Sequence, residues 1–564
     1  MIYPRLTPIV LTALLLWGAT AHGQPADPQT DAPLSVIDWL DQPAPAGPLP
    51  RAPDAALPGT PLNGAMLTDE PAVTSTGKPP QIVTRPLDAA PAPAVGLVPP
   101  GITGIQPDLW SGSTAQVLAD QISDLEESDL PAASALLFTL LLAQAAPPAG
   151  GAPAQDILTR ARVRKLMELG AVDPALALVE QAGAATSPAL FDLWADLSLL
   201  VGTEDTPCAA LATAPWLTSD MGIRIFCAAR GGDWDTANLS FGAATALSLL
   251  PRETLDALDR FLNPDLFEDA PALPMPRAMD PLTFRLYETI GEALPTGPLP
   301  RAYAVADLRD LSGWKSQLEA AERLTRVGAL PDNRLLGLYT DRRPAASGGI
   351  WDRVRAVQQF DAALSERSAE AVARTLPAAW AQMREAQLEV SFATLFHDRL
   401  EDIALTGPAA AIKAEMGLLS PAYEQVAAGL SPDALEGADA LQGVDLRLLR
   451  GVALGDMTGL PAGAAPDGAV TRAIYDAFSG PLSGPVTGPV TGPVSGTAPR
   501  PEWITMARNG QLGEALLATL AALHDGAGGD SRALREALGT LRALGLEDTA
   551  RRAALQILLL DRTP

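Results

Sequence analysis

The segment 207–237 constrains the fold of this chain more than any other stretch. Pro207 suits the first turn of a helix, and Ala214-Pro215 ends that helix. Ser219-Asp220 can cap a second helix that runs to Gly231-Gly232. Two helices joined by so short a break are expected to lie antiparallel. The sequence therefore predicts a helical hairpin.

The two cysteines of the chain, Cys208 and Cys227, lie in this hairpin. The midpoint between them falls at the turn, so an antiparallel pairing brings the start of the first helix beside the end of the second. In an oxidising compartment such a pair is expected to be bonded. We predict a disulfide; the alternative is two buried thiols.

The hairpin is followed by a turn pattern that recurs along the chain. It reads Gly-x-x-Asp-x-Ala or a close variant, in which glycine makes the turn and the small alanine permits close approach of two helices. It begins at these four glycines: Gly170, Gly232, Gly510 and Gly545. The pattern indicates stacked helix pairs.

Four stretches around these turns resemble tetratricopeptide-like helical repeats: LMELGAVDPALALVEQ, ARGGDWDTANLSFGAA, ARNGQLGEALLATLAAL and LRALGLEDTARRAALQIL. The last two turns are about 35 residues apart, close to the roughly 34-residue period of that family. The chain lacks the full family pattern and a constant period. The resemblance implies an irregular α-solenoid of stacked antiparallel helix pairs.

Composition and charge exclude several function classes. Apolar residues make up 47% of the chain but aromatic residues only 5%, alongside 53 Pro and 48 Gly, which suits small-residue helices interrupted by loops. The formal net charge of −26 argues against nucleic acid, because phosphate binding needs a basic surface. It argues against an anionic membrane surface for the same reason.

The N-terminus has the features of a secretory signal peptide. Arg5 precedes an apolar run from Ile9 to Trp17, and small residues follow near Ala21. That run is too short for a membrane span. We predict a signal peptide over 1–23, a periplasmic or secreted location of the Gram-negative type, and no integral membrane span in the mature protein.

The segment 24–104 is dense in Pro and Ala and is predicted to be a disordered tail. One island within it gathers large apolar residues within two helical turns: Val36, Ile37, Trp39 and Leu40. Such a short amphipathic element is typical of a ligand that binds a partner's groove or sheet edge. The alternative is that the island packs on its own solenoid or is solvated.

Helical periodicity begins near residue 108 and continues to about 455. Ser113-Thr114 and Ser312 are expected N-caps, and no sheet is predicted because no run of alternating β-branched residues is present. The expected helices include 113–125, 130–146, 157–169, 190–200, 237–250, 252–262, 282–293, 299–311, 313–327, 332–340, 350–364, 368–386 and 388–404. Tryptophans 194, 216, 234, 314, 351 and 380 are expected in the core.

These patterns divide the chain into an α-solenoid over 105–478, a Gly-Pro-rich linker over 479–501 and a C-terminal helical cap over 502–564. The linker repeats Gly-Pro-x-Ser/Thr with a period of four, which excludes the collagen period of three. About 60 residues form only a marginal core, so docking of the cap on the solenoid is favoured over independent folding.

A search for catalytic motifs gives weak candidates. Ser312 and Lys315 match S-x-x-K without its companion elements, and Ser312 is explained as an N-cap. His397 and Glu401 lie four residues apart, but two ligands do not fill a zinc site. Asp192 and Asp196 are interpreted as solvated. We predict no catalytic residue, no metal and no cofactor.

Periplasmic α-superhelices also occur in soluble lytic transglycosylases, which use a Glu followed by Ser. The one such pair here is Glu127-Ser128, without the surrounding motifs of the catalytic domain. Any similarity implies only the non-catalytic helical part of that family.

The sequence therefore predicts an exported, non-catalytic helical scaffold or adaptor that binds a protein or envelope partner. Two alternatives stay open: a cell-wall (peptidoglycan) associated protein related to the superhelical part of lytic transglycosylases, and a structural envelope protein. The sequence names neither the partner nor the oligomeric state.

Overall fold

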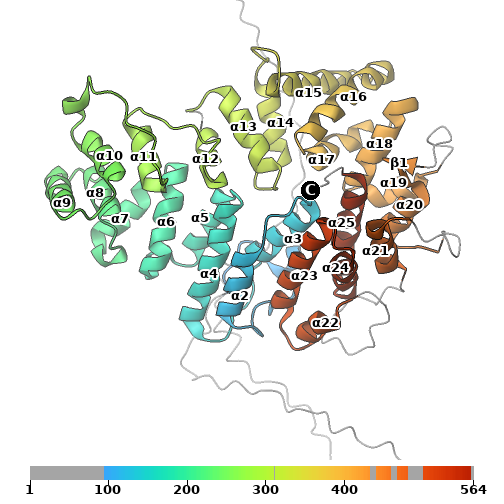
Figure 1. Cartoon of the computed structure of the whole chain (residues 1–564), viewed down its shortest axis with the longest axis horizontal. Coiled ribbons are helices and arrows are strands. Elements are labelled where there is room, and N and C mark those ends of the chain that lie inside the picture. The colour runs from blue at the N-terminus through green and yellow to red at the C-terminus, as the bar shows by residue number, and fades with distance from the viewer. Residues whose placement is uncertain (1–93, 310, 432–439, 459–466, 480–498, 561–564) are drawn as a thin grey trace, which may run out of the picture. The chain divides into compact units, whose positions relative to one another are not determined.

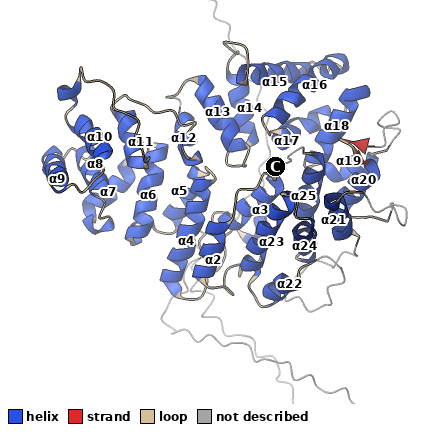
Figure 2. Ribbon diagram, in the orientation of Figure 1, coloured by secondary structure: helices blue, strands red, loops and turns tan. Residues whose placement is uncertain are grey.

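The computed structural model describes residues 94–309, 311–431, 440–458, 467–479 and 499–560. The chain divides into two units, Met1–Thr84 and Arg85–Pro564, and all described residues belong to the second. Helices make up nearly all of the regular structure of these residues (Figure 2). The predicted all-α fold class is confirmed.

The helices of the first half are α1 (Pro100–Thr103), α2 (Ala115–Asp124), α3 (Pro131–Leu142), α4 (Gly151–Glu168), α5 (Val172–Gln181), α6 (Pro188–Val201), α7 (Asp205–Thr213), α8 (Met221–Arg230), α9 (Trp234–Leu247), α10 (Arg252–Leu262), α11 (Pro281–Thr289) and α12 (Ala304–Asp307). Short 3₁₀ helices lie between them: η1 (Ala184–Thr186), η2 (Pro215–Leu217), η3 (Pro264–Phe267) and η4 (Arg301–Tyr303). The helix expected over 299–311 is therefore only the short pair η4 and α12.

The helices of the second half are α13 (Trp314–Thr325), α14 (Asp332–Asp341), α15 (Ile350–Ser365), α16 (Ala369–Glu385), α17 (Glu389–Leu400), α18 (Gly407–Leu419), α19 (Tyr423–Gly429), α20 (Leu446–Leu454), α21 (Ala469–Phe478), α22 (Pro501–Arg508), α23 (Leu512–Ala527), α24 (Ser531–Ala543) and α25 (Glu547–Leu559). Most helices pack against their neighbours in sequence.

The prediction of no sheet is wrong at one place. Strands β1 (Ala440–Leu441) and β2 (Val444–Asp445) form a small antiparallel hairpin. Its two turn residues, Gln442 and Gly443, have φ of 49° and 77°. A two-residue hairpin turn needs positive φ at both central residues, and glycine adopts positive φ readily. Gly443, and not a run of β-branched residues, was therefore the sequence feature that indicated this hairpin.

The four predicted turns share one geometry. Gly170, Gly232, Gly510 and Gly545 have φ of 82°, 82°, 84° and 85°. In each, the residue after the glycine donates its N–H to the carbonyl five residues earlier, as Leu546 does to Leu541 at 2.8 Å. The alanine five residues after each glycine is fully buried: Ala175, Ala237, Ala515 and Ala550.

Among the described residues, two turns of this kind that have a buried residue five positions later lack glycine. Arg367 and Gln387 have φ of 52° and 57°, and the backbone N–H groups that follow them again bond back to the preceding helix. The buried residues five positions later are Val372 and Phe392 instead of alanine. A search for Gly and Ala at fixed spacing therefore misses these two turns.

The C-terminal helices pack against the first helices of the described chain. Helix α23 contacts α2 and α3, while α25 contacts α3, α18 and α20 (Figure 1). Gly513 of α23 donates its N–H to the carbonyl of Leu109 at 3.0 Å. A Cβ at Gly513 would lie 2.5 Å from Trp110 Cε3, so only glycine fits there. In an open solenoid, each repeat contacts only its sequence neighbours; these contacts link distant parts of the chain.

The start of the described chain is held by one buried cation. Arg162 of α4 is fully buried and donates to the carbonyls of Leu141, Val95 and Ala143 at 2.6, 3.0 and 3.0 Å. Gln181 bonds both the N–H and the carbonyl of Gly96. These contacts place residues 95–98 against the end of α3.

The expectation that the tryptophans lie in the core is only partly right. Trp194, Trp314 and Trp380 are buried, whereas Trp216 and Trp234 are 59% and 47% exposed. Both exposed tryptophans belong to the region of α7 to α10.

Candidate functional site

A cavity of about 680 Å³ lies where four segments far apart in sequence meet. Its walls come from α3, from the start of α5, from the turn between α13 and α14, and from the turn between α16 and α17. Cavities of roughly 300 to 1,000 Å³ are typical of ligand sites. We call this space the central cavity.

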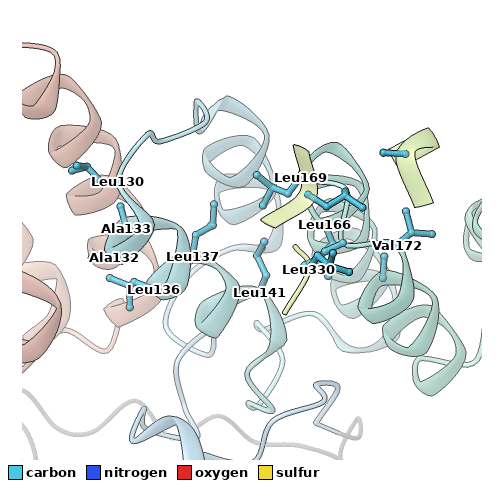
Figure 3. Close-up of a cluster of buried hydrophobic side chains, with 14 of the residues drawn as sticks. Leu130, Ala132, Ala133, Leu136, Leu137, Leu141, Leu166, Leu169, Val172 and Leu330 are labelled. Atoms are coloured by element: carbon cyan, nitrogen blue, oxygen red, sulfur yellow. The ribbon is translucent and has the colours of Figure 1, made fainter. Parts of the chain in front are cut away.

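Helix α3 supplies the apolar wall of the central cavity. Pro131, Ala135, Phe138 and Leu142 line it at the spacing of one helix face. The other side of α3 is buried in the core, where Figure 3 shows Leu141 clustered with Leu166 of α4 and Leu330. The helix is apolar all round, so its sequence gave no sign of which face lines a cavity.

Two polar groups line the opposite side. Thr325, at the end of α13, is 3% exposed, and its hydroxyl has no hydrogen-bond partner among the described residues. Asp332, at the start of α14, is half-buried; burial raises the pKa of its carboxyl, although the Ser391 hydroxyl donates to it. A buried hydroxyl without a partner is costly and marks a position where a ligand can bond.

The two turns that line the central cavity are tied together. Arg326, just after α13, donates from Nε to the carbonyl of Ala386 at 3.0 Å, beside the turn at Gln387. This bond links two of the segments that line the central cavity.

A second cavity of about 430 Å³ lies beside α17, α18 and α19. His397 lines it and is 6% exposed, and its Nδ1 has no hydrogen-bond partner among the described residues. Burial lowers the pKa of His397, which favours the neutral imidazole. Lys413 donates to the carbonyls of Glu401 and Ile403 at 2.8 and 2.9 Å.

His397 and Glu401, which the sequence places four residues apart, both line this cavity. In the part of the chain that is described, no group of three or more His, Cys, Asp or Glu side chains is placed to hold a metal ion. Lys413 occupies the same wall instead and contributes a positive charge.

The predicted disulfide is present. Cys208 of α7 and Cys227 of α8 are bonded, with their Cα atoms 4.9 Å apart. Helices α7 and α8 pack against each other, as the hairpin requires. The Asp220 side chain accepts from the N–H of Ile223 at 3.0 Å and so caps α8, one of the two caps that the sequence offered.

Several predicted features fall outside the described residues. These are the signal peptide over 1–23, most of the tail over 24–104, the apolar island Val36, Ile37, Trp39 and Leu40, and most of the linker over 479–501. Partner binding by the island stays a prediction.

The S-x-x-K match does not form a catalytic pair. The Ser312 hydroxyl donates to Asp307 Oδ1 at 2.7 Å, while Lys315 pairs with Glu319 at 3.0 Å. The prediction that Ser312 caps the following helix is wrong, because Gly313 is the N-cap residue of α13 and makes no side-chain bond.

Glu127 is engaged in an ion pair. Arg301 donates to both of its carboxylate oxygens, at 2.8 and 2.6 Å, and joins the loop between α2 and α3 to η4. The Arg301 side chain in turn packs over Gly170 at the turn between α4 and α5. The position of Glu127 is explained by this structural link.

Asp196 is not simply solvated, contrary to its interpretation from sequence. It is half-buried in α6, and burial, followed by the charges of Asp280, Asp192 and Asp220, raises its pKa to about 7. Asp192 is exposed and accepts from Thr218 Oγ1 at 2.8 Å. The raised pKa of Asp196 arises first from its burial and then from nearby charges, among them Asp280, the N-cap residue of α11, which no local pattern could bring to Asp196.

None of the described helices has the length and hydrophobicity that a membrane span needs. Comparisons with protein-family models, with curated proteins and with solved structures found no match for this chain.

Proposed function

We propose that this chain is an exported, non-catalytic helical scaffold or adaptor that binds a protein partner in the periplasm or outside the cell, using the central cavity. The observation that carries this proposal is the central cavity itself, with its apolar α3 wall and, opposite, the Thr325 hydroxyl, which has no hydrogen-bond partner in the part of the chain that the structure describes.

The cavity favours bulky apolar side chains of a protein segment. Phe138, Leu142 and Val390 offer apolar surface, while Thr325 and Asp332 offer a hydroxyl and a carboxyl to backbone N–H groups of that segment. Interfaces gain most of their affinity where a few large side chains enter well-packed pockets. The hydrogen bond from Arg326 to Ala386 joins two of the lining segments, and such a restraint reduces the entropy lost on binding.

Two observations support export. The N-terminal sequence has the features of a signal peptide, and the disulfide between Cys208 and Cys227 is a bond that persists in oxidising compartments.

The test is site-specific photocrosslinking in cells. Ala135, which is exposed and lines the central cavity, is replaced by the photoreactive residue p-benzoylphenylalanine; the matched control carries it at Gln116, which is exposed on α2. We expect a protein adduct at Ala135 that is absent at Gln116 and is reduced at least tenfold by Phe138→Asp. Identical adducts at both positions, or none at Ala135, would overturn the proposal.

The cell-wall alternative has its own readout. Purified protein is incubated with peptidoglycan, and released muropeptides are measured for the natural sequence and for Glu127→Gln. We expect no release from either protein. Release that is lost in Glu127→Gln would show that the chain is an enzyme.

A further inference from the structure

The cavity beside α17, α18 and α19 is separate from the central cavity, because no described residue lines both. We call it the histidine cavity, after His397 on its wall. Helix α18 packs against both α17 and α19 (Figure 1). The volume of about 430 Å³ lies within the range of roughly 300 to 1,000 Å³ that is typical of sites for small ligands. The histidine cavity is therefore a second place where a ligand can bind.

The charged residues of the histidine cavity leave one negative charge unbalanced. Asp398 and Glu401 line it with two exposed carboxylates, and Lys413 contributes one ammonium. No described side chain forms a hydrogen bond or a close ion pair with either carboxylate, although the charges of Glu401 and Lys413 attract each other. Two of the three N–H groups of Lys413 already bond the carbonyls of Glu401 and Ile403. A ligand with one positive charge therefore balances this cavity.

The carboxyl end of α17 adds to this preference. The helix ends at Leu400, and Glu401 is its C-cap residue. The C-terminus of a helix carries a partial negative charge, so a cation is favoured beside it. The formal net charge of −26 of the whole chain acts in the same direction. Both effects favour a cationic ligand over an anionic one.

The imidazole of His397 offers a hydrogen-bond acceptor to such a ligand. His397 lies on the cavity wall and is 6% exposed, and its Nδ1 has no hydrogen-bond partner in the described chain. Burial lowers the pKa of His397, so the ring is neutral at pH 7 and keeps one nitrogen that accepts a hydrogen bond. A polar group without a partner at this depth marks a position where a ligand can bond.

Close packing holds His397 in place. A Cβ at Gly417 of α18 would lie 2.9 Å from His397 Cε1 and 2.7 Å from Val426 Cγ2. Glycine at this position therefore lets α18 approach both side chains closely. Since His397 and Val426 line the cavity, the contact restricts their movement, and less entropy is lost when a ligand binds.

The rest of the histidine cavity is mostly apolar. Its larger apolar lining residues are Ile403, Leu405, Val426 and Leu430. A ligand that fills the cavity therefore buries an apolar group against them, and this burial adds to the affinity that its charge supplies.

We propose that the histidine cavity binds a primary ammonium group attached to an apolar chain. The ammonium donates its three N–H groups to the carboxylates of Asp398 and Glu401 and to the ring of His397. A free alkylamine and the amino terminus of a peptide with an apolar first residue share this chemistry. Binding here is independent of partner binding by the central cavity.

The first test is isothermal titration calorimetry of the purified, disulfide-bonded protein at pH 7. The probes are hexylamine and the tripeptide amide Leu-Ala-Ala with a free amino terminus. We expect one site with a dissociation constant below about 1 mM for at least one of them, and the tighter one identifies the source of the ammonium. Hexan-1-ol, hexanoate and the N-acetylated tripeptide are expected to bind about tenfold more weakly, because they lack the positive charge. Failure of both amines to bind, or equal binding of the uncharged compounds, overturns the proposal.

The second test locates the site with Glu401→Gln, which removes one carboxylate and keeps the size of the side chain. We expect the dissociation constant of the tighter amine to rise about fivefold, which is the upper end for an exposed ion pair. The matched control is Asp402→Asn, because Asp402 is also exposed, does not line the cavity and pairs with Arg367 at 3.2 Å. Equal effects of the two substitutions would contradict a site in the histidine cavity.

The third test separates binding by the imidazole from its packing. His397→Gln keeps an uncharged hydrogen-bond acceptor, whereas His397→Leu does not. We expect the dissociation constant of the tighter amine to be about fivefold higher in His397→Leu than in His397→Gln. Circular dichroism checks that both variants fold, and equal dissociation constants would contradict the role of His397 as an acceptor.

Discussion

The backbone N–H of Ala132 donates to Oε1 of Gln556 at 2.9 Å, although 424 residues separate the two. Ala132 lies in the first turn of α3, whose N-cap residue Leu130 makes no side-chain bond. Gln556 lies in α25 and is only 4% exposed. The last helix of the chain thus caps the helix that forms the wall of the central cavity.

Gln556→Met removes this cap while keeping the size of the side chain. A buried N–H left without an acceptor costs about 1 to 3 kcal/mol, so we expect the free energy of unfolding to fall by that amount. Urea denaturation followed by circular dichroism measures it. Gln116→Met, at an exposed site, serves as control, and an equal effect there would contradict the role of Gln556 as a cap.

Gly170 and Gly232 both have φ of 82°. Alanine would therefore carry the same backbone strain at either position, and any difference in cost between the two substitutions comes from packing. A Cβ at Gly232 would meet nothing within 4 Å, whereas one at Gly170 would lie 2.6 Å from Leu324 and 2.7 Å from Arg301. We expect Gly232→Ala to cost about 1 kcal/mol of stability and Gly170→Ala about 2 to 4 kcal/mol. Chemical denaturation of both variants tests this. Equal losses of stability would show that the Arg301 side chain moves away from the added methyl group at no cost.

Gln387 occupies a left-handed turn that favours glycine. We expect Gln387→Gly to stabilise the protein by about 0.5 to 1 kcal/mol, because the relief of strain exceeds the entropy that glycine adds to the unfolded chain. Gln382→Gly, inside α16, is the control and is expected to cost about 1 kcal/mol. A loss of stability in both variants would contradict the strain argument.

Asp196 makes stability depend on pH. Its pKa is raised to about 7, so between pH 4 and pH 7 the folded protein keeps a proton that the unfolded chain has released. Stability from this group is therefore lost as the pH rises through that range. We expect Asp196→Asn to stabilise the protein by about 1 to 2 kcal/mol at pH 8 and by little at pH 4. The gain at pH 8 is smaller than the full pKa shift implies, because solvent screens the half-buried carboxylate. Thermal unfolding at both pH values checks this, with the exposed Asp192→Asn as control; a gain equal at both pH values would refute it.

The disulfide closes a loop with a sequence separation of 19. Replacing both Cys208 and Cys227 with Ser is expected to cost about 3 kcal/mol, mainly by freeing the unfolded chain. Denaturation with and without reductant tests this. Reduction should lower the free energy of unfolding of the natural protein to that of the variant and leave the free energy of the variant unchanged. A variant as stable as the oxidised protein would show that packing alone holds the hairpin.

Much of the local structure could be predicted from sequence. Gly170, Gly232, Gly510 and Gly545 marked helix–helix turns because only glycine adopts left-handed backbone without strain. The pairing of Cys208 with Cys227 followed from the length of the hairpin between them. Arg367 and Gln387 escaped prediction because surrounding packing, and not residue type, imposes the same turn on them.

The sequence by itself determined most of the helices, the turns marked by glycine and the disulfide, since each depends on residues close together in the chain. The tertiary structure alone decided that Gln556 meets Ala132, that Phe138 faces a cavity and Leu141 the core, and that Asp280 approaches Asp196. The physical reason is that burial and charge act between groups brought together by packing over hundreds of residues. An apolar helix such as α3 carries no mark of which neighbour will cover each face.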